Sequence, residues 1–218
     1  MIISERKPLE ELRESIDSLQ RFFLIGCGAC ATVCKSGGEE EVFLMQEWLI
    51  DQGREVTGSM VIDEACHLLR AGRELRHHKS AVREADALIV LACGGGVQSV
   101  TAQTEKRVIG ALNSMFLGNV RRYGQYEEKC SLCGECLLNE TAGICPVTTC
   151  AKGLLNGPCG GMEEGRCEVD ADLECAWHLI YERLKRQNRP GVFARRVPAK
   201  AWGRHRRPGR HQLKHNGR

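Results

Sequence analysis

The sequence predicts an α/β domain followed by a small, irregular, cysteine-rich domain. Short apolar segments alternate with amphipathic ones through the first half of the chain, which is the pattern of strands and helices in a parallel sheet. The cysteines predict the second domain, since eight of the 13 fall between Cys130 and Cys175. We place the α/β domain at residues 1–120, the cysteine-rich domain at 121–187 and a basic tail at 188–218.

The first two helices and strands follow from apolar spacing. Residues 8–19 predict a helix, because apolar residues recur at helical spacing and a proline occupies a first-turn position. The apolar run 21–25 predicts a buried strand that meets a loop. Residues 39–52 then suit a helix, and residues 56–62 suit a second strand.

The same alternation continues toward the middle of the chain. Residues 67–85 have helical spacing, and residues 87–92 form the strongest strand pattern in the sequence. That strand runs directly into the Cys-Gly-Gly-Gly segment at 93–96. A further helix and a weaker strand at 108–112 precede a predicted linker at 118–128.

This order of elements implies a parallel sheet with right-handed crossovers, flavodoxin-like in outline. Binding sites in such sheets form beyond the carboxyl ends of the strands. Cysteines follow the first three predicted strands there, namely Cys27, Cys66 and Cys93. Cys30 and Cys34 share the loop of Cys27. We therefore expect five thiols to converge on one edge of the sheet.

The spacing Cys27-x2-Cys30-x3-Cys34 predicts metal binding, because three thiolates so spaced can wrap one face of a cluster. A fourth ligand must come from far along the chain, and Cys93 or Cys66 could supply it. The alternative for either of these two is a buried small hydrophobe, a common fate of free cysteine. Zinc is the competing metal, since four thiolates in a tetrahedron also make a closed structural site.

The second cysteine-rich region opens with Cys130-x2-Cys133-x2-Cys136, and Cys145-Pro follows. This resembles the bacterial ferredoxin pattern, although the stretch 137–144 makes the spacing a variant. The remaining thiols of this region are those of Cys150, Cys159, Cys167 and Cys175. Eight thiols suffice for two four-iron clusters, or for one cluster and one zinc ion.

Charge and composition limit the class of protein. From Arg183 onward there are 13 Lys and Arg and no Asp or Glu, whereas the preceding 182 residues carry a net charge of −10. We expect the polar tail to be disordered and the acidic body not to bind nucleic acid, with a nucleic-acid-binding tail as the alternative. The charged N-terminus lacks a signal-peptide pattern and no apolar run suits a bilayer, which predicts a cytoplasmic protein with reduced thiols.

Residues 172–187 predict an amphipathic helix. Its apolar stripe consists of Leu173, Trp177, Ile180 and Leu184. The sequence shows no Ser-His-Asp set, no paired carboxylates and no Walker-type loop. It therefore predicts a chain without catalytic apparatus of its own.

Four segments of the cysteine-rich region resemble the methylenetetrahydrofolate reductase C-terminal domain. They are Cys130-x2-Cys133-x2-Cys136, the run from Thr141-Ala-Gly-Ile-Cys145-Pro to Gly-Pro-Cys159-Gly-Gly161, the stretch Gly165-Arg-Cys-Glu-Val169, and Cys175-Ala-Trp-His-Leu-Ile-Tyr-Glu-Arg-Leu184. The upstream half is similar to the N-terminal half of the small, MetV-type iron–sulfur and zinc subunit of that reductase. It shares Cys27-Gly-Ala-Cys30, Cys66 and Ala92-Cys-Gly-Gly-Gly-Val-Gln98.

The resemblance implies an electron-transfer subunit. The large partner in that family is a flavoprotein that reduces methylenetetrahydrofolate, and the small subunit relays electrons from a donor protein to its flavin through [4Fe-4S] clusters. The resemblance implies that Cys27, Cys30, Cys34 and Cys93 or Cys66 hold one centre, and that the eight later cysteines hold the others, with zinc at one site as a possibility. The alternative is a zinc-binding structural subunit of the same complex that moves no electrons.

Overall fold

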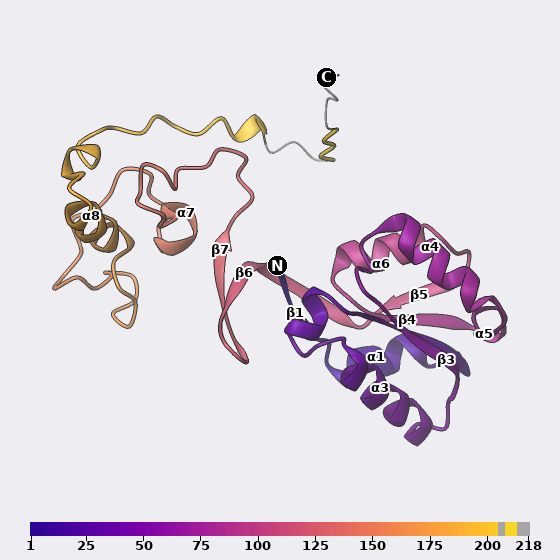
Figure 1. Cartoon of the computed structure of the whole chain (residues 1–218). Helices are drawn as coiled ribbons and strands as arrows, with labels where there is room; N and C mark the ends of the chain where they lie inside the picture. Colours follow the sequence, from indigo (N-terminus) through magenta and orange to yellow (C-terminus); the bar gives the residue numbers. More distant parts are fainter. Residues whose placement is uncertain (205–207, 213–218) are drawn as a thin grey trace. The chain divides into compact units, whose positions relative to one another are not determined.

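The computed structural model describes residues 1–204 and 208–212 and divides into two compact units (Figure 1). The first unit is Met1–Glu127 and the second is Glu128–Arg218. The boundary thus lies a few residues beyond the predicted one at 120. The reason is that the predicted linker at 118–128 is part of a β-hairpin, described below.

The first unit contains a four-stranded parallel sheet, which confirms the predicted α/β class. Its strands are β2 (Arg21–Cys27), β3 (Glu55–Ile62), β4 (Ala87–Leu91) and β5 (Arg107–Gly110). They are ordered β3-β2-β4-β5, so β2 pairs on both sides. Each of the four strands contains or overlaps a strand predicted from the sequence.

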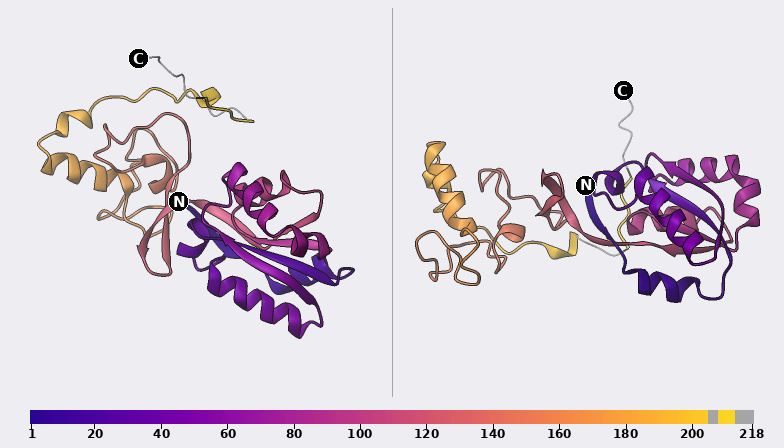
Figure 2. Two further views of the ribbon diagram at one scale, coloured as in Figure 1. Left: turned by 45° about the vertical axis from the view of Figure 1, so that its right-hand side comes forward. Right: turned by 90° about the horizontal axis from the view of Figure 1, so that it is seen from below.

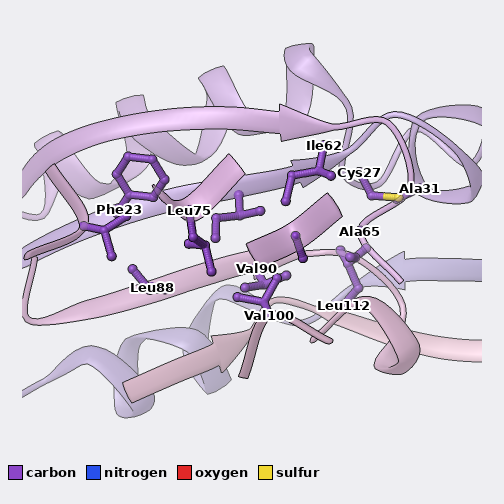
Figure 3. Packing of buried hydrophobic residues seen from close by; sticks show 14 of the residues in the cluster. Phe23, Cys27, Ala31, Ile62, Ala65, Leu75, Leu88, Val90, Val100 and Leu112 are labelled. Carbon is purple, nitrogen blue, oxygen red and sulfur yellow. The ribbon is translucent and has the colours of Figure 1, made fainter. Parts of the chain in front are cut away.

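Helices cover both faces of this sheet (Figures 1 and 2). The helices are α1 (Leu9–Ile16), α3 (Glu39–Asp51), α4 (Leu68–His77), α5 (Lys79–Glu84) and α6 (Gly94–Thr101). Phe22 and Leu24 of β2 pack in the cluster formed with α1 and α3. Phe23 and Ile25 belong to the opposite cluster, formed with α4, α5 and α6 (Figure 3). The alternation of side chains along a strand thus buries β2 on both faces.

A second, antiparallel sheet was not anticipated from the sequence. Its strands, in the order β1-β6-β7, are β1 (Ile2–Arg6), β6 (Leu112–Arg122) and β7 (Gln125–Cys130). Gly124 lies between the last two strands with a φ of 76°, a left-handed conformation that favours glycine. Most side chains of β7 are charged or exposed, so no apolar run marks this strand in the sequence.

The cysteine-rich unit contains little regular structure. Its helices are α7 (Pro146–Thr149) and α8 (Ala176–Arg186), with short 3₁₀ segments η1 (Pro190–Val192) and η2 (Trp202–Arg204). Trp177, Ile180 and Leu184 of the predicted stripe are buried, whereas Leu173 precedes the helix and is exposed. The thiol of Cys175 joins this small core.

The first part of the predicted disordered tail packs against the cysteine-rich unit instead. The ring of Phe193 meets Trp177 edge-on at 5.7 Å between ring centroids and Tyr181 at 5.4 Å. Arg189 Nη2 donates a hydrogen bond of 2.9 Å to the carbonyl oxygen of Asn139. The predicted boundary at 187 therefore falls inside this unit, and residues 205–207 and 213–218 of the predicted tail lie outside the described residues.

Over the part of the chain that the structure describes, no helix combines the length and the apolar character needed to cross a membrane.

Asp86 is expected to give the first unit an acid-sensitive contribution to stability. Its carboxylate accepts hydrogen bonds from the backbone N–H groups of Arg21 and Gln20, at 2.8 and 3.1 Å, and these bonds hold the pKa of Asp86 below its usual range. A lowered pKa in the folded state stabilises the protein above the unfolded pKa of about 3.9, and this stabilisation is lost as pH falls through the folded value. We expect Asp86→Ala to lower the urea midpoint at pH 7.

The control for this prediction is Asp51→Ala, at the exposed end of α3. This change should leave the urea midpoint close to that of the unaltered protein. The deficit of Asp86→Ala should begin to shrink as the pH falls from about 5 to about 3, through the unfolded pKa, and should disappear only below the folded pKa, where the carboxyl group is protonated in both states. A deficit that stays constant over this range would contradict the assignment.

Candidate metal centres

Cysteines gather at the carboxyl edge of the parallel sheet, as predicted. β2 ends at Cys27, Cys93 precedes α6 directly after β4, and Cys66 lies in the turn between β3 and α4. Parallel strands end at a common edge, so these three positions meet there. Figure 3 shows Cys27 beside Ala31, at the end of the buried cluster where Ala65 also lies.

Four thiols at this edge are close neighbours. A Cβ atom built on Gly95 would lie 3.7 Å from Cys66 Cβ and 3.9 Å from Cys93 Sγ, so these two side chains flank the same glycine. Burial raises the pKa of the Cys66 thiol, and the negative charges of Cys93, Cys27 and Cys30 raise it further. Thiolates crowded in this way repel one another, and a bound cation or cluster would relieve that repulsion. We call Cys27, Cys30, Cys66 and Cys93 the sheet-edge set.

Cys34 has different neighbours. It ends the short helix α2 (Cys30–Val33), and its buried sulfur lies 3.7 Å from the carbonyl oxygen of Ile2 on β1. Burial, and then the charge of Cys34, raise the pKa of Tyr126, whose hydroxyl donates a hydrogen bond to the carbonyl oxygen of Val33. The sequence predicts that five thiols converge on the edge of the parallel sheet. The structure turns one of them, that of Cys34, toward the antiparallel sheet instead.

A second set of four cysteines lines one cavity of about 340 Å³ in the cysteine-rich unit. We call these residues, Cys130, Cys133, Cys136 and Cys145, the loop set. Leu132 and Gly134 both adopt positive φ values, 56° and 75°, so the chain turns tightly between the first three cysteines. The structure therefore brings together the triplet and the Cys-Pro cysteine, across the intervening stretch 137–144.

The environment of Cys133 is electropositive. Burial by itself raises the pKa of the Cys133 thiol, but hydrogen bonds with the backbone of Glu135 and with the side chains of Lys200 and Ser131 lower the pKa below its ordinary value. The Nζ atom of Lys200 lies 3.1 Å from Cys133 Sγ. A thiolate is the form that binds metal, so this surrounding favours the ligand form of Cys133.

A third set lines a much smaller cavity, of about 20 Å³. Its members, which we call the helix set, are Cys150, Cys159, Cys167 and Cys175. Cys175 is the residue before α8, and its N–H donates a hydrogen bond of 2.8 Å to the carbonyl oxygen of Gly165. The N–H of Cys167 donates a hydrogen bond of 2.9 Å to the carbonyl oxygen of Leu173. These bonds fold the chain back on itself around the cavity.

The three sets account for 12 of the 13 cysteines. All of the cysteines are free thiols. Within residues 1–204 and 208–212, no three His, Cys, Asp or Glu side chains are arranged to hold a single metal ion. The number and softness of the donors in each set still fit a thiolate-bound iron–sulfur cluster, because a cluster distributes its ligands over several iron atoms. A single zinc ion would require the four thiols of a set to move closer together.

The fold and these sites define a chain that joins a parallel α/β unit to an irregular unit with two cavities lined by cysteines. Residues 109–203 match the family described as methylene-tetrahydrofolate reductase C terminal. The matched segment includes the loop set, the helix set and Lys200. No curated protein matches the chain.

Lys200 was missed by the sequence reasoning, which assigned it to a disordered tail. The basic composition of the tail hides a segment that is anchored to the cysteine-rich unit. A signal was present in Phe193, a large apolar residue in a mostly polar stretch, whose ring packs on Trp177 and Tyr181. The sequence offers no means of pairing Lys200 with Cys133, because 66 residues separate the two positions.

Proposed function

We propose that this chain binds [4Fe-4S] clusters and relays single electrons to the flavin of a methylenetetrahydrofolate reductase. The observation that carries the proposal is the loop set, in which Cys130, Cys133, Cys136 and Cys145 line one cavity inside the segment that matches the reductase family. The order of these four cysteines is close to the ligand pattern of bacterial ferredoxins. The partner is inferred from the family match alone.

In this proposal the loop set and the sheet-edge set each hold one [4Fe-4S] cluster. The cysteines supply the thiolate ligands, and a cluster supplies one-electron oxidation and reduction when bound. The chain's own groups would then fix the ligands and their surroundings. The backbone at Gly95, for example, lies beside Cys66 and Cys93, where N–H groups can donate hydrogen bonds to sulfur and raise a reduction potential.

The helix set suits a zinc ion better. Its cavity of about 20 Å³ has room for about one small ion, whereas that of the loop set is about 340 Å³. Four thiolates around one ion form a closed structural zinc site. In the described residues these thiols line one cavity but are not yet arranged around a single ion. We therefore propose that zinc binding draws Cys150, Cys159, Cys167 and Cys175 together and fastens α8 to the rest of this unit.

A second candidate function is a zinc-binding structural subunit of the same complex that moves no electrons. The small cavity of the helix set favours zinc in at least one place. In this alternative, zinc occupies the other two sets as well, since four thiolates also satisfy zinc there. The two functions predict a different iron content, sulfide content and colour of the purified protein.

Metal and sulfide analysis of anaerobically purified protein tests the proposal. We expect about eight irons, about eight acid-labile sulfides and about one zinc per chain, with an EPR signal after dithionite reduction. The reduced chain should then reduce the flavin of a purified methylenetetrahydrofolate reductase flavoprotein, as followed by flavin absorbance. Zinc alone, without sulfide or an EPR signal, would establish the structural alternative.

A further inference from the structure

A buried lysine lies against the loop set. Lys200 is only 7% exposed and lines the same cavity as the four cysteines. Its Nζ atom is 3.1 Å from Cys133 Sγ, and it donates a second, short hydrogen bond to the carbonyl oxygen of Glu135. Lysine is almost never buried unless its charge is compensated, so the position of this ammonium group requires a partner of opposite charge. A thiolate-bound centre provides one.

The segment that carries Lys200 is fixed on both sides of it. On the N-terminal side, Asn156 and Val197 exchange two hydrogen bonds, of 2.8 Å from Asn156 Nδ2 and 2.7 Å from the Val197 N–H. On the C-terminal side, the N–H of Ala201 donates a hydrogen bond of 3.0 Å to Glu135 Oε2. The backbone on either side of Lys200 is therefore anchored, and the ammonium group is held by its own hydrogen bonds to Cys133 Sγ and the Glu135 carbonyl oxygen.

A fixed positive charge changes the energy of an electron added nearby. One-electron reduction makes a cluster more negative, and a buried cation stabilises that added charge more strongly than a solvated one does, because the local dielectric constant is low. A hydrogen bond to a ligand sulfur acts in the same direction. Both effects raise the reduction potential.

We propose that Lys200 is a tuning residue that raises the reduction potential of the centre held by Cys130, Cys133, Cys136 and Cys145. This inference rests on the proposed function, because it requires a redox-active cluster at the loop set. It assigns a role to the segment after residue 187, which the sequence marks only as basic.

The test compares charge-removing and charge-keeping variants of the full chain. Lys200→Gln and Lys200→Met remove the charge, and Lys200→Arg keeps it. Lys185→Gln, on the exposed side of α8, is the matched control. Each protein is purified anaerobically, its iron and sulfide are measured, and the cluster is titrated electrochemically with EPR detection. The signal of the loop set is identified as the one lost in Cys133→Ser.

We expect the two neutral variants to keep their iron and to bind the electron about tenfold more weakly, which corresponds to a potential about 59 mV more negative. Lys200→Arg and Lys185→Gln should stay close to the unaltered protein. An unchanged potential in the neutral variants would overturn the inference. Loss of iron in both neutral variants but not in Lys200→Arg would also overturn the inference, because the charge would then be needed to assemble the cluster. An unaltered protein without any reduced-cluster signal would instead refute the proposed function.

Discussion

Replacing Cys66 with alanine is expected to remove one cluster, about four irons and four sulfides per chain, whereas replacing Cys34 with alanine should leave both unchanged. The reason is the different placement of the two thiols. Cys66 shares the sheet edge with Cys93, Cys27 and Cys30, whose charges act on it. The Cys34 sulfur contacts the carbonyl oxygen of Ile2 instead. The sequence alone favours the opposite result, because Cys34 completes a compact triplet and Cys66 stands alone.

Iron and sulfide analysis of the two variants checks this prediction, with circular dichroism to show that each is folded. Cys34→Ala is the matched control, since it also removes one thiol from the same unit, and from a more buried position than that of Cys66. Iron loss in Cys34→Ala together with full iron in Cys66→Ala would contradict the prediction. It would mean that Cys34, with Cys27 and Cys30, is a ligand and that Cys66 is not. Equal losses of iron in the two variants would mean that any change in packing at this edge of the parallel sheet disturbs the cluster.

Replacing Gly37 with alanine is expected to destabilise the first unit by about 3 kcal/mol or more, at the upper end of the usual cost of overpacking. A Cβ atom at this position would lie 2.0 Å from the carbonyl oxygen of Leu91, at the end of β4. The clash could be relieved only by moving backbone. Leu91 belongs to β4, and Gly37 is tied to β2, because its carbonyl oxygen accepts a 2.8 Å hydrogen bond from the N–H of Cys27. The loop of Gly37 thus closes directly over the edge that carries Cys27.

Urea unfolding of the full chain, followed by circular dichroism, measures this effect. Gly94→Ala is the matched control, because a Cβ atom there would meet only Ser114 Oγ at 3.8 Å, an ordinary contact. That variant should unfold at nearly the same urea concentration as the unaltered protein. A Gly37→Ala protein as stable as the control would show that the loop can move away from β4 without cost.

The sequence could predict the parallel sheet because the evidence for it is local. Residues 87–91 are continuously apolar, as expected of a strand buried on both faces, and the structure places β4 there with every residue buried. The hairpin of β6 and β7 gave no such signal, since its residues are largely polar or exposed and are held by pairing with other strands. The break between α4 and α5 at His78 was also invisible in the helical spacing of residues 67–85.

The sequence by itself determined that cysteines follow β2, β3 and β4, and therefore that thiols meet at one edge of the sheet. It also determined that eight more thiols lie close together along the chain. Both results depend only on the order of residues and on the common direction of parallel strands.

Only the tertiary structure decided which thiols share a site. It grouped Cys66 with Cys93, turned Cys34 toward β1, and divided the later eight cysteines between a large and a small cavity. It also brought Lys200 to Cys133 from a segment that reads as a solvated tail. These groupings depend on side-chain direction and on contacts between distant segments, and neither is encoded in the spacing of residues along the chain.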